Sequence, residues 1–536
     1  MPRAAPVPAT LDPLLAALAR GVIADRARSF AARAQLLAAC RRRLAASIDD
    51  WAAAAATGKG AADDPAVLAE ELGHGPLPVA RHLLLLEGTL RGLARGRLPR
   101  LRALSTAAGP RVRAVPRGLR DRLLLPGYRA DVDCEPGQLL QAPPPGGQGV
   151  HVVLGAGNVS SMPVGDALDA LCRRGAAVLL KLSPLHAALQ PVLERVLAPL
   201  IERDLLRLCC GDADLGAPAL RDPRVAAWHL TGAPATLQAI LRDPAAAAKP
   251  WTAELGNVTP VVVVPGIWSD RDLRTAANQL AAWFGHNAAG NCATPRLVLT
   301  AAGWPQRAAF LQHLGRAVDS LPPRRPFDPR ARGRFARFAG DAAIASVTDG
   351  ERLPFVLRTG VDLDREPHLA AEESFAPVLC EVAVPGQDAA AFADRCLGLL
   401  RERVSGALCA HVLAPEPVLA RAAHAVARLV DALPHGTVAI NTWAVVGYAL
   451  LAPPWGTGAT AQGAALGRGF AHDTLCLRAP RRTVVQAPFR PRPAPPWFAD
   501  PDPAPLLRAL TLVHTTPGPG PALRAATAAL RRGRLR

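Results

Sequence analysis

A regular alternation of strand-like and helix-like segments begins at residue 150 and constrains the fold more than any other feature. Short apolar runs predict strands, and each is followed by a longer segment in which apolar residues recur at helical spacing. Alternation at this spacing is typical of a parallel sheet with helices on both faces. The predicted strands are 150–154, 176–180 and 225–230, and the predicted helices are 165–173, 185–203 and 235–242.

A second series of strand-like runs follows residue 254. These runs are again short, apolar and separated by helical segments, so they predict a second α/β unit. The predicted strands are 261–264, 297–300, 378–384 and 407–413.

The part of the chain before residue 150 has a different character. Residues 11–100 are rich in Ala, Leu and Arg with apolar residues three to four apart, which predicts helices. Helix breakers gather between Gly58 and Pro78, where a connection is expected. Residues 101–145 predict loops with a short strand or two.

The tail beyond Arg478 is Pro-rich, with a predicted linker at 491–496 and a short helix at 523–531. The formal net charge is +18, which either attracts a polyanion or is spread over solvated faces. Because no basic stripe carries interleaved aromatic residues, we favour the second interpretation and expect no nucleic-acid partner. Only the Arg-rich end, from Arg524 to Arg536, leaves that question open.

Neither a membrane segment nor a metal site is predicted. No stretch approaches the roughly 18 uninterrupted apolar residues of a membrane helix. The ten cysteines are scattered without CxxC pairs or metal-like spacing, and Cys209 and Cys210 are adjacent, a poor geometry for a bridge. A reducing compartment, the cytoplasm, fits this pattern.

Lys and Asn are scarce in this Arg- and Ala-rich chain, so the positions where they occur are informative. The sequence holds three Lys, at 59, 181 and 249, and six Asn, at 158, 257, 278, 287, 291 and 441. Four of the six Asn lie near Cys292, beside Glu254, or in the glycine turn at 155–160.

Cys292 and Glu254 are the strongest candidates for chemistry. Each lies shortly before a predicted buried strand, and a thiol beside a carboxylate can combine nucleophilic attack with hydrolysis. His286 could pair with Cys292 instead, but no cysteine-protease signature surrounds the thiol, so a packed histidine is favoured.

Three further candidates follow the strands of the first series. Asn158 lies in the turn after the first strand, where its amide could donate to an anion. Lys181 ends the second strand, where ligands gather in open parallel sheets. Gly232 follows the third strand and permits close approach of a phosphate. Taken alone, the turns at Asn158 and Gly232 are as consistent with structure as with function.

Together with later segments, these residues resemble the aldehyde dehydrogenase superfamily, in order and in spacing, from about Val150 to Ala479. The segments that carry the resemblance are the turn with Asn158, Lys181, Thr231-Gly232, Glu254-Leu255-Gly256, Asn287-x4-Cys292-x3-Arg296, Glu372-Glu373-x-Phe375-x-Pro377-Val378 and Asn441-Thr442-Trp443 followed by Pro454-Trp455-Gly456.

The resemblance implies an α/β fold, with a Rossmann-type cofactor domain plus a second α/β catalytic domain, and it implies roles in catalysis. Cys292 would be the nucleophile and Glu254 the general base. Asn158, with the backbone N–H of Cys292, would form the oxyanion hole.

The resemblance also implies NAD or NADP as the cofactor, with four residues that would bind it. Lys181 would reach the adenosine ribose and Glu373 the nicotinamide ribose. Phe375 would pack against the nicotinamide, and Gly232 would lie beside the pyrophosphate. Pro184 stands where many NAD-preferring members carry Glu, so the choice between NAD and NADP stays open.

The implied domain organisation has four parts. Residues 1–255 would hold the N-terminal helices and the NAD(P)-binding domain, and 256–440 the catalytic domain. Residues 441–485 would return to the domain junction and could carry an oligomerisation strand, and 486–536 would form a Pro/Arg-rich tail. Family members usually pair through β segments, so a homodimer or homotetramer is implied.

The implied reaction is oxidation of an aldehyde to a carboxylic acid, and two alternatives stay open. One is a CoA-acylating acyl reductase of the same superfamily, although such enzymes often lack the base that Glu254 would supply. The other is a non-catalytic basic binding protein on a decayed dehydrogenase fold. The joint presence of all the candidate site residues argues against decay.

Overall fold

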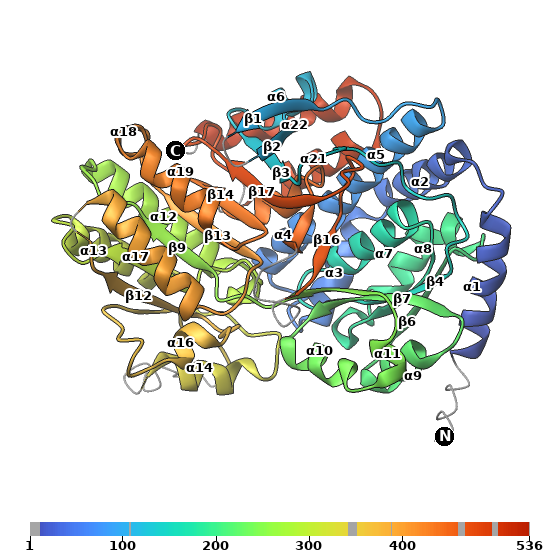
Figure 1. Ribbon diagram of the computed structural model, residues 1–536, viewed down its shortest axis with the longest axis horizontal. Helices are drawn as coiled ribbons and strands as arrows, with labels where there is room; N and C mark the ends of the chain where they lie inside the picture. Colours follow the sequence, from blue (N-terminus) through green and yellow to red (C-terminus); the bar gives the residue numbers. More distant parts are fainter. Residues whose placement is uncertain are drawn as a thin grey trace.

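Two separate β-sheets organise the chain in the computed structural model, which describes residues 11–106, 109–340, 351–386, 388–458, 467–495 and 502–534. One sheet has five strands and the other has ten. Figure 1 shows the five-stranded sheet in the half of the molecule that also holds the first helices of the chain. The predicted α/β fold with two α/β units is therefore confirmed.

The five-stranded sheet is parallel throughout, in the order β6-β5-β4-β7-β8. The three strands predicted in this region are confirmed as β4, β5 and β7. The outer strands β6 and β8 were not predicted, because each carries a charged side chain among its apolar residues, which weakens the apolar signal. The strands are β4 (Val150–Leu154), β5 (Ala177–Leu182), β6 (Leu206–Cys210), β7 (Val225–Gly232) and β8 (Trp251–Leu255).

Helices cover this sheet as the alternation predicted. The helix predicted at 185–203 begins later, because a short 3-10 turn at Pro184–His186 precedes it. Its buried face belongs to a core with the apolar residues of β5 and β6. The helices are α7 (Met162–Arg173), α8 (Gln190–Ile201), α9 (Ala213–Arg221), α10 (Pro234–Leu241) and α11 (Pro244–Ala247).

The N-terminal part is helical as predicted, but the connection expected between Gly58 and Pro78 is confined mainly to residues 59–64. A helix, α4, begins after them because the Asp64 carboxylate accepts hydrogen bonds from the backbone N–H groups of Ala66 and Val67. Helices α4 and α5 both have a proline in the first turn. A proline is tolerated there because the N–H that it lacks would have no hydrogen-bond partner within the helix. The helices are α1 (Asp12–Asp25), α2 (Phe30–Ala45), α3 (Ile48–Gly58), α4 (Pro65–His74), α5 (Pro76–Leu93) and α6 (Leu119–Leu124).

The ten-stranded sheet has a parallel part and an antiparallel part, in the order β1-β2-β3-β17-β14-β13-β9-β10-β12-β11. The predicted strands β9, β10, β12 and β13 lie together in the parallel part and are confirmed. Residues 101–145 hold three antiparallel strands, more than the one or two predicted. The strands are β1 (Arg102–Thr106), β2 (Gly109–Val115), β3 (Arg129–Cys134), β9 (Pro260–Val263), β10 (Leu297–Ala301), β11 (Val356–Arg358), β12 (Val378–Val384), β13 (Cys409–Leu413), β14 (Thr437–Ile440) and β17 (Pro480–Gln486).

The remaining elements pack around this second sheet. A small antiparallel pair, β15 (Trp455–Gly458) and β16 (Gly469–Ala471), lies close to β8 through a bridge between Ala253 and Arg468. The helices are α12 (Asp270–Gly285), α13 (Arg307–Asp319), α14 (Ala331–Ala339), α16 (His368–Ala371), α17 (Ala389–Glu402), α18 (Glu416–Arg421), α19 (Ala423–Ala432) and α20 (Val445–Ala449).

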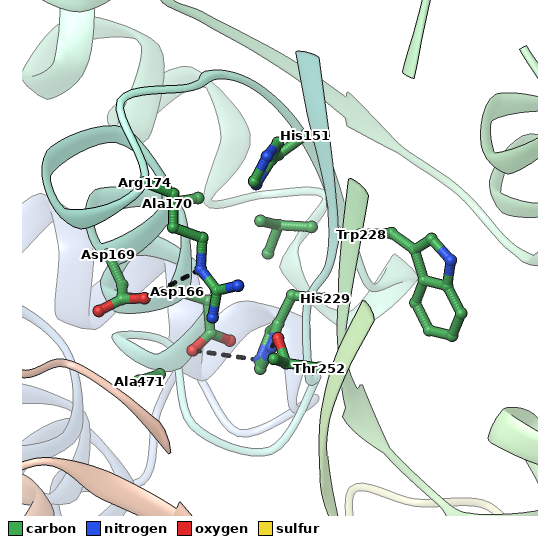
Figure 2. A pocket seen from close by; sticks show the side chains of 10 residues that line it. His151, Asp166, Asp169, Ala170, Arg174, Trp228, His229, Thr252 and Ala471 are labelled. Atoms are coloured by element: carbon green, nitrogen blue, oxygen red, sulfur yellow. Dashed lines mark hydrogen bonds and ion pairs between the residues drawn. The ribbon is translucent and has the colours of Figure 1, made fainter. Parts of the chain in front are cut away.

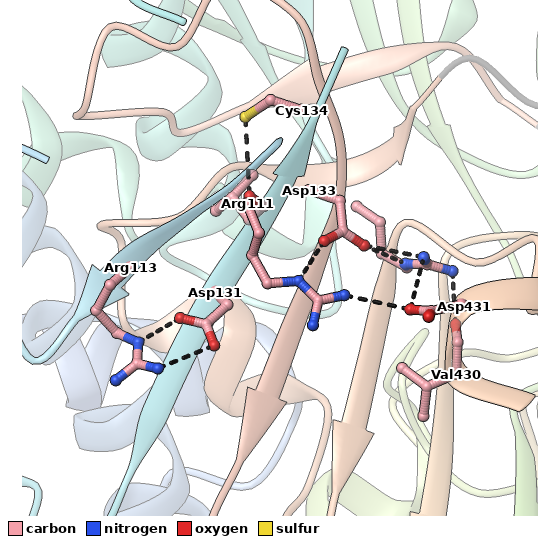
Figure 3. A network of polar contacts seen from close by, with 9 residues as sticks. Arg111, Arg113, Asp131, Asp133, Cys134, Val430 and Asp431 are labelled. Atoms are coloured by element: carbon pink, nitrogen blue, oxygen red, sulfur yellow. Dashed lines mark hydrogen bonds and ion pairs between the residues drawn. The ribbon is translucent and has the colours of Figure 1, made fainter. Parts of the chain in front are cut away.

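Buried ion pairs hold the antiparallel strands to the parallel part of the sheet. Figure 3 shows the guanidinium group of Arg111 directed at Asp133 of β3. Asp133 also forms an ion pair with Arg482 of β17. The Nε of Arg111 lies 2.5 Å from Asp133, and Nη2 of Arg482 lies 2.9 Å from it. Burial alone would raise the pKa of the Asp133 carboxyl, but these two partners hold it below its usual value. Strand β17 therefore joins segments from opposite ends of the chain.

The tail is more structured than its Pro content predicted. Residues 491–495 form no helix or strand, as expected for a linker, and Pro496 lies outside the described residues. Helix α21 (Ala504–Thr515) follows, and Leu507 packs in one core with Ile48, Ala52 and Leu72. The helix predicted at 523–531 lies within α22 (Pro519–Arg534). The Arg side chains from 531 onward lie outside the described residues.

Among the described helices, none has the length and apolarity needed to span a membrane. All ten cysteines are free thiols.

Candidate functional site

Cys292 and Glu254 lie together although 38 residues separate them in the sequence. Glu254 extends from β8, opposite Thr231 of β7, and Cys292 lies in the loop that leads into β10. The thiol sulphur of Cys292 lies 3.8 Å from Oε1 of Glu254 and donates its hydrogen bond there. The two sheets thus contribute one group each to the pair.

Burial controls the protonation of both groups. It raises the pKa of Glu254 to about 7, and the negative charge of Asp166 adds to this effect. Burial also raises the pKa of the Cys292 thiol well above its ordinary value, and the Glu254 carboxylate raises it further. Near neutral pH the sulphur is therefore protonated, and Glu254 is the nearby group that can accept its proton.

The loop before Cys292 has a strained backbone. Three consecutive residues, Asn287, Ala288 and Ala289, have φ values of 55°, 52° and 59°. Asn tolerates this left-handed region, but each Ala costs roughly 1–2 kcal/mol there. Contacts from elsewhere in the fold must therefore hold this loop in place.

A buried polar network holds the loop. The amide nitrogen of Asn287 lies 2.9 Å from Oδ1 of Asn291 and 3.0 Å from the backbone oxygen of Asn158. The ammonium of Lys59 donates to Oδ1 of Asn287 at 2.6 Å and lies 2.5 Å from the carboxylate of Glu71. Lys59, on the N-terminal side of α4, thus fixes the orientation of Asn287.

Sequence reasoning missed Lys59, although its rarity was a usable signal. Lys59 is one of three lysines in the chain and is only 8% exposed. It donates a hydrogen bond to Asn287, which is one of six asparagines. The same scarcity that marked Lys181 applied to Lys59.

Asn158 lies beside the same loop. Its Nδ2 donates to the backbone oxygen of Gly290 at 3.1 Å. An amide NH2 carries two hydrogens, so the second can serve another acceptor. Asn158, Cys292 and Glu254 are thereby brought into one place.

A second polar network, which the sequence did not reveal, lies beneath Glu254. Asp166 of α7 accepts from the hydroxyl of Thr231 at 2.9 Å and from Nε2 of His472 at 2.8 Å. Figure 2 shows Asp166 facing His229 of β7, whose Nε2 lies 3.6 Å away. Despite burial, the two histidines lower the pKa of Asp166, and Asp166 in turn raises the pKa of His472. A permanent negative charge therefore lies close to Glu254.

Lys181 and Gly232 lie at the carboxyl end of the five-stranded sheet. Lys181 is next to last in β5, half-buried, and burial lowers the pKa of its ammonium. No ion pair to it occurs in the part of the chain that the structure describes. Gly232 ends β7, directly before Ala233 and the first turn of α10. Backbone N–H groups at such a helix start favour an anion.

Glu373 approaches the loop that follows β8. A Cβ on Gly256 would lie 2.2 Å from Oε2 of Glu373, so only glycine admits the carboxylate there. Burial raises the pKa of Glu373 to about 7, although Arg296 opposes the shift. Its Oε1 is buried with no hydrogen-bond partner among the described residues.

Phe375 lies between two guanidinium groups. The carbons Cζ of Arg296 and Arg334 each lie 5.9 Å from the centre of its ring. Arg296 also donates to the backbone oxygens of Ala289 and Ala376, at 2.5 Å and 2.9 Å. Arg296 therefore ties the cysteine loop to the loop of Glu373 and Phe375.

His286 does not form a dyad with Cys292. Its ring lies 4.5 Å from that of His74 and 5.0 Å from that of Trp443, and burial lowers its pKa. It is a packed histidine, as the sequence favoured. Within the described ranges, no three His, Cys, Asp or Glu side chains are grouped to hold a metal ion.

Part of the chain is similar to a known protein family. The model of the aldehyde dehydrogenase family matches residues 148–332. No curated protein sequence matches the chain.

Solved structures show the same fold at low sequence identity. An NAD+ complex of an aldehyde dehydrogenase from Mycobacterium tuberculosis is 17% identical, with a TM-score of 0.61 over 91% of this chain and 92% of the other. Aldehyde dehydrogenase C from Pseudomonas syringae, a variant bound to NAD+ and octanal, is 17% identical, with a TM-score of 0.61 over 91% and 90%. An aldehyde dehydrogenase from Brucella melitensis is 18% identical, with a TM-score of 0.60 over 90% of each chain.

Proposed function

We propose that this chain is a divergent member of the aldehyde dehydrogenase superfamily and that it oxidises an aldehyde to a carboxylic acid with NAD or NADP. The observation that carries the proposal is the buried pair of Cys292 and Glu254, 3.8 Å apart, with the amide of Asn158 beside the same loop. A nucleophile, a base and an amide donor are the three groups that acyl chemistry through a thioester requires.

The first step is capture of the aldehyde by Cys292. As the sulphur bonds to the carbonyl carbon, its proton passes to Glu254, whose carboxylate lies within reach. The carbonyl oxygen becomes an oxyanion, which the second amide hydrogen of Asn158 and the backbone N–H of Cys292 stabilise. Losing one such donor typically costs roughly 3–4 kcal/mol in the transition state.

The residues present suit a nicotinamide cofactor. Lys181 would bind the adenosine ribose, Gly232 would lie beside the pyrophosphate, and the buried unpaired oxygen of Glu373 would accept from the nicotinamide ribose. Phe375 would pack against the nicotinamide. When bound, such a cofactor supplies the acceptor for the hydride that leaves the captured carbon.

Hydrolysis completes the reaction. The acyl group is then held on Cys292 as a thioester. Glu254 releases the proton it took from the thiol to solvent, and then takes a proton from a water molecule that attacks the thioester. The proton returns to the sulphur as the carboxylic acid leaves. A base with a pKa of about 7 suits this role at neutral pH.

Absorbance of reduced cofactor, with a panel of aldehydes and both NAD and NADP, tests the proposal. We expect reduction of cofactor with at least one aldehyde, and none with Cys292→Ala. Reduction that strictly requires added CoA would replace hydrolysis by acyl transfer to CoA. A salt-sensitive gel shift with DNA, together with no reduction by any aldehyde, would favour a binding protein on this fold instead.

A further inference from the structure

Glu254 is a base with little direct access to bulk water. It is 4% exposed, and its Oε2 is buried without a hydrogen-bond partner in the part of the chain that the structure describes. In the proposed reaction, one proton passes from the thiol of Cys292 to Glu254 and then to solvent in each turnover. Proton transfer needs groups within hydrogen-bond reach, directly or through one water molecule. A route from Glu254 to the surface must therefore run along neighbouring side chains.

Strands β7 and β8 place four polar side chains on one face of the five-stranded sheet. Thr231 pairs with Glu254 across the two strands, and His229 pairs with Thr252 two residues earlier. Asp166 of α7 contacts this face through Thr231. His229 is thus the diagonal neighbour of Glu254, and diagonal neighbours lie roughly 7–8 Å apart, which long side chains and one water molecule span. Burial raises the pKa of Glu254 and the charge of His229 opposes this rise, which agrees with their proximity.

Hydrogen bonds hold the ring of His229 in a defined orientation. Because the hydroxyl of Thr231 donates to Asp166 at 2.9 Å, it accepts from Nε2–H of His229, which lies 3.0 Å away. The other ring nitrogen, Nδ1, lies 2.8 Å from the hydroxyl of Thr252 and accepts from it. Nδ1 can take up a proton when this hydroxyl turns. The carboxylate of Asp166, 3.6 Å from Nε2, stabilises the cation that results.

A small polar cavity lies between His229 and the surface of the protein. Figure 2 shows the polar side chains that line it, which are those of His151, Asp166, Asp169, Arg174, His229 and Thr252. Its volume of about 10 Å³ is enough for roughly one water molecule. The side chain of Arg174 is 36% exposed and that of His229 is 14% exposed, against 1% for Asp166. His229 is therefore more accessible to water than either Asp166 or Glu254.

Among the described residues, the other ionisable groups near Glu254 offer no comparable exit. His472, which follows β16, donates to the second oxygen of Asp166 at 2.8 Å, but it is buried and so anchors Asp166. Tyr448 of α20 and Cys409 of β13 interact with the charge of Glu254. Burial raises the pKa of both groups, so neither loses its proton near neutral pH.

We propose that His229 carries the proton of Glu254 to water in this cavity. The proposal rests on the proposed aldehyde oxidation, in which Glu254 must become a carboxylate again before water attacks the thioester. The O–H bond of Glu254 breaks and an N–H bond forms at Nδ1 of His229, through one bridging water molecule. This N–H bond then breaks as the hydroxyl of Thr252 passes a proton to water in the cavity. Asp166 stays ionised throughout and holds the ring.

Stopped-flow measurement of cofactor reduction and proton release tests this route, with phenol red in weak buffer at mildly alkaline pH. His229→Gln keeps an amide that can hydrogen-bond to Thr231 and Thr252 but cannot carry the proton. Because Glu254 is then mostly a carboxylate at the start, this variant should still give a first burst of reduced cofactor at the wild-type rate. Release of the proton should lag behind that burst, and steady turnover should fall by at least about tenfold.

A second variant separates proton transfer from a structural role. His229→Ala leaves a space that imidazole can enter, so imidazole added to the assay should restore most of its lost turnover and leave wild type unchanged. His424→Gln is the matched control, because it makes the same substitution at an exposed histidine of α19. This control should release its proton together with the burst and turn over at the wild-type rate.

The results distinguish failure of the proton route from failure of the proposed function. If wild type reduces cofactor and His229→Gln releases its proton with the burst and turns over at the wild-type rate, the route is wrong and the proposed function stands. Loss of the burst in both His229 variants, or slow turnover of His229→Ala that imidazole does not restore, would make the ring structural and also overturn the route. If wild type reduces no cofactor with any aldehyde, the proposed function fails and the route falls with it.

Discussion

Replacing Lys59 by Met tests whether a buried ammonium holds the cysteine loop. In the wild type this group lies between the carboxylate of Glu71, at 2.5 Å, and Oδ1 of Asn287, at 2.6 Å. Met retains most of the apolar stem and removes only the charge and its hydrogen bonds. Glu71, which is fully buried, would then carry an unpaired charge.

Removal of one partner from a buried ion pair typically costs about 3–5 kcal/mol. The strained φ angles of Ala288 and Ala289 add to the loss of stability, because the loop no longer has the contact that orients Asn287. We therefore expect Lys59→Met to lower the free energy of unfolding by about 3–5 kcal/mol and to reduce kcat more than KM.

Urea denaturation followed by circular dichroism measures the stability change. Lys249→Met is the matched control, because the ammonium of Lys249 donates to the backbone oxygens of Leu220 and Asp222, away from the loop. The double variant Lys59→Met with Glu71→Gln should recover part of the loss. A change below about 1 kcal/mol in Lys59→Met, with unchanged kcat, would refute the reasoning.

Three further predictions follow from the site. Glu254 is active as a carboxylate and its pKa is raised to about 7, so kcat/KM should rise through that pH, and Glu254→Gln should lose this rise. Ala288→Gly should raise the free energy of unfolding by roughly 0.5–1 kcal/mol, whereas Ala53→Gly inside α3 should lower it by a similar amount. The pKa of Glu373 is raised from 4.5 to about 7, so stability is lost as pH rises between those values. Glu373→Gln should therefore be more stable than wild type near pH 8 by roughly 3 kcal/mol, with no gain near pH 4, as urea titrations at both pH values would show.

The sequence predicted the strands whose apolar runs are continuous and missed those that depend on tertiary context. Val261 to Val264 form an unbroken β-branched run, and this strand was predicted. Trp251–Leu255 mixes Trp, Thr and Glu, and it becomes a strand because β7 lies beside it. The connection expected between Gly58 and Pro78 is shorter than predicted because Pro65 begins a helix that Asp64 caps, which a count of helix breakers does not detect.

The residues of the candidate site show the same contrast between local sequence patterns and tertiary context. Cys292, Glu254 and Asn158 were singled out because each lies in a local pattern next to a predicted strand, and the structure brings them together. Asp166 and His472 lie 306 residues apart, and nothing local marks their contact. Their proximity depends on how β16 approaches α7, which a single sequence does not encode in any short pattern.

The most direct test of the central claim is a mass measurement on Glu254→Gln. With the base removed, the Cys292 thiol must lose its proton to solvent instead, so incubation with cofactor and an aldehyde that the wild type oxidises should produce one slower burst of reduced cofactor and leave the acyl group on the enzyme. Intact mass and peptide mapping should then place one acyl group on Cys292. Steady turnover of this variant at the wild-type rate, or an acyl group on any other residue, would contradict the account.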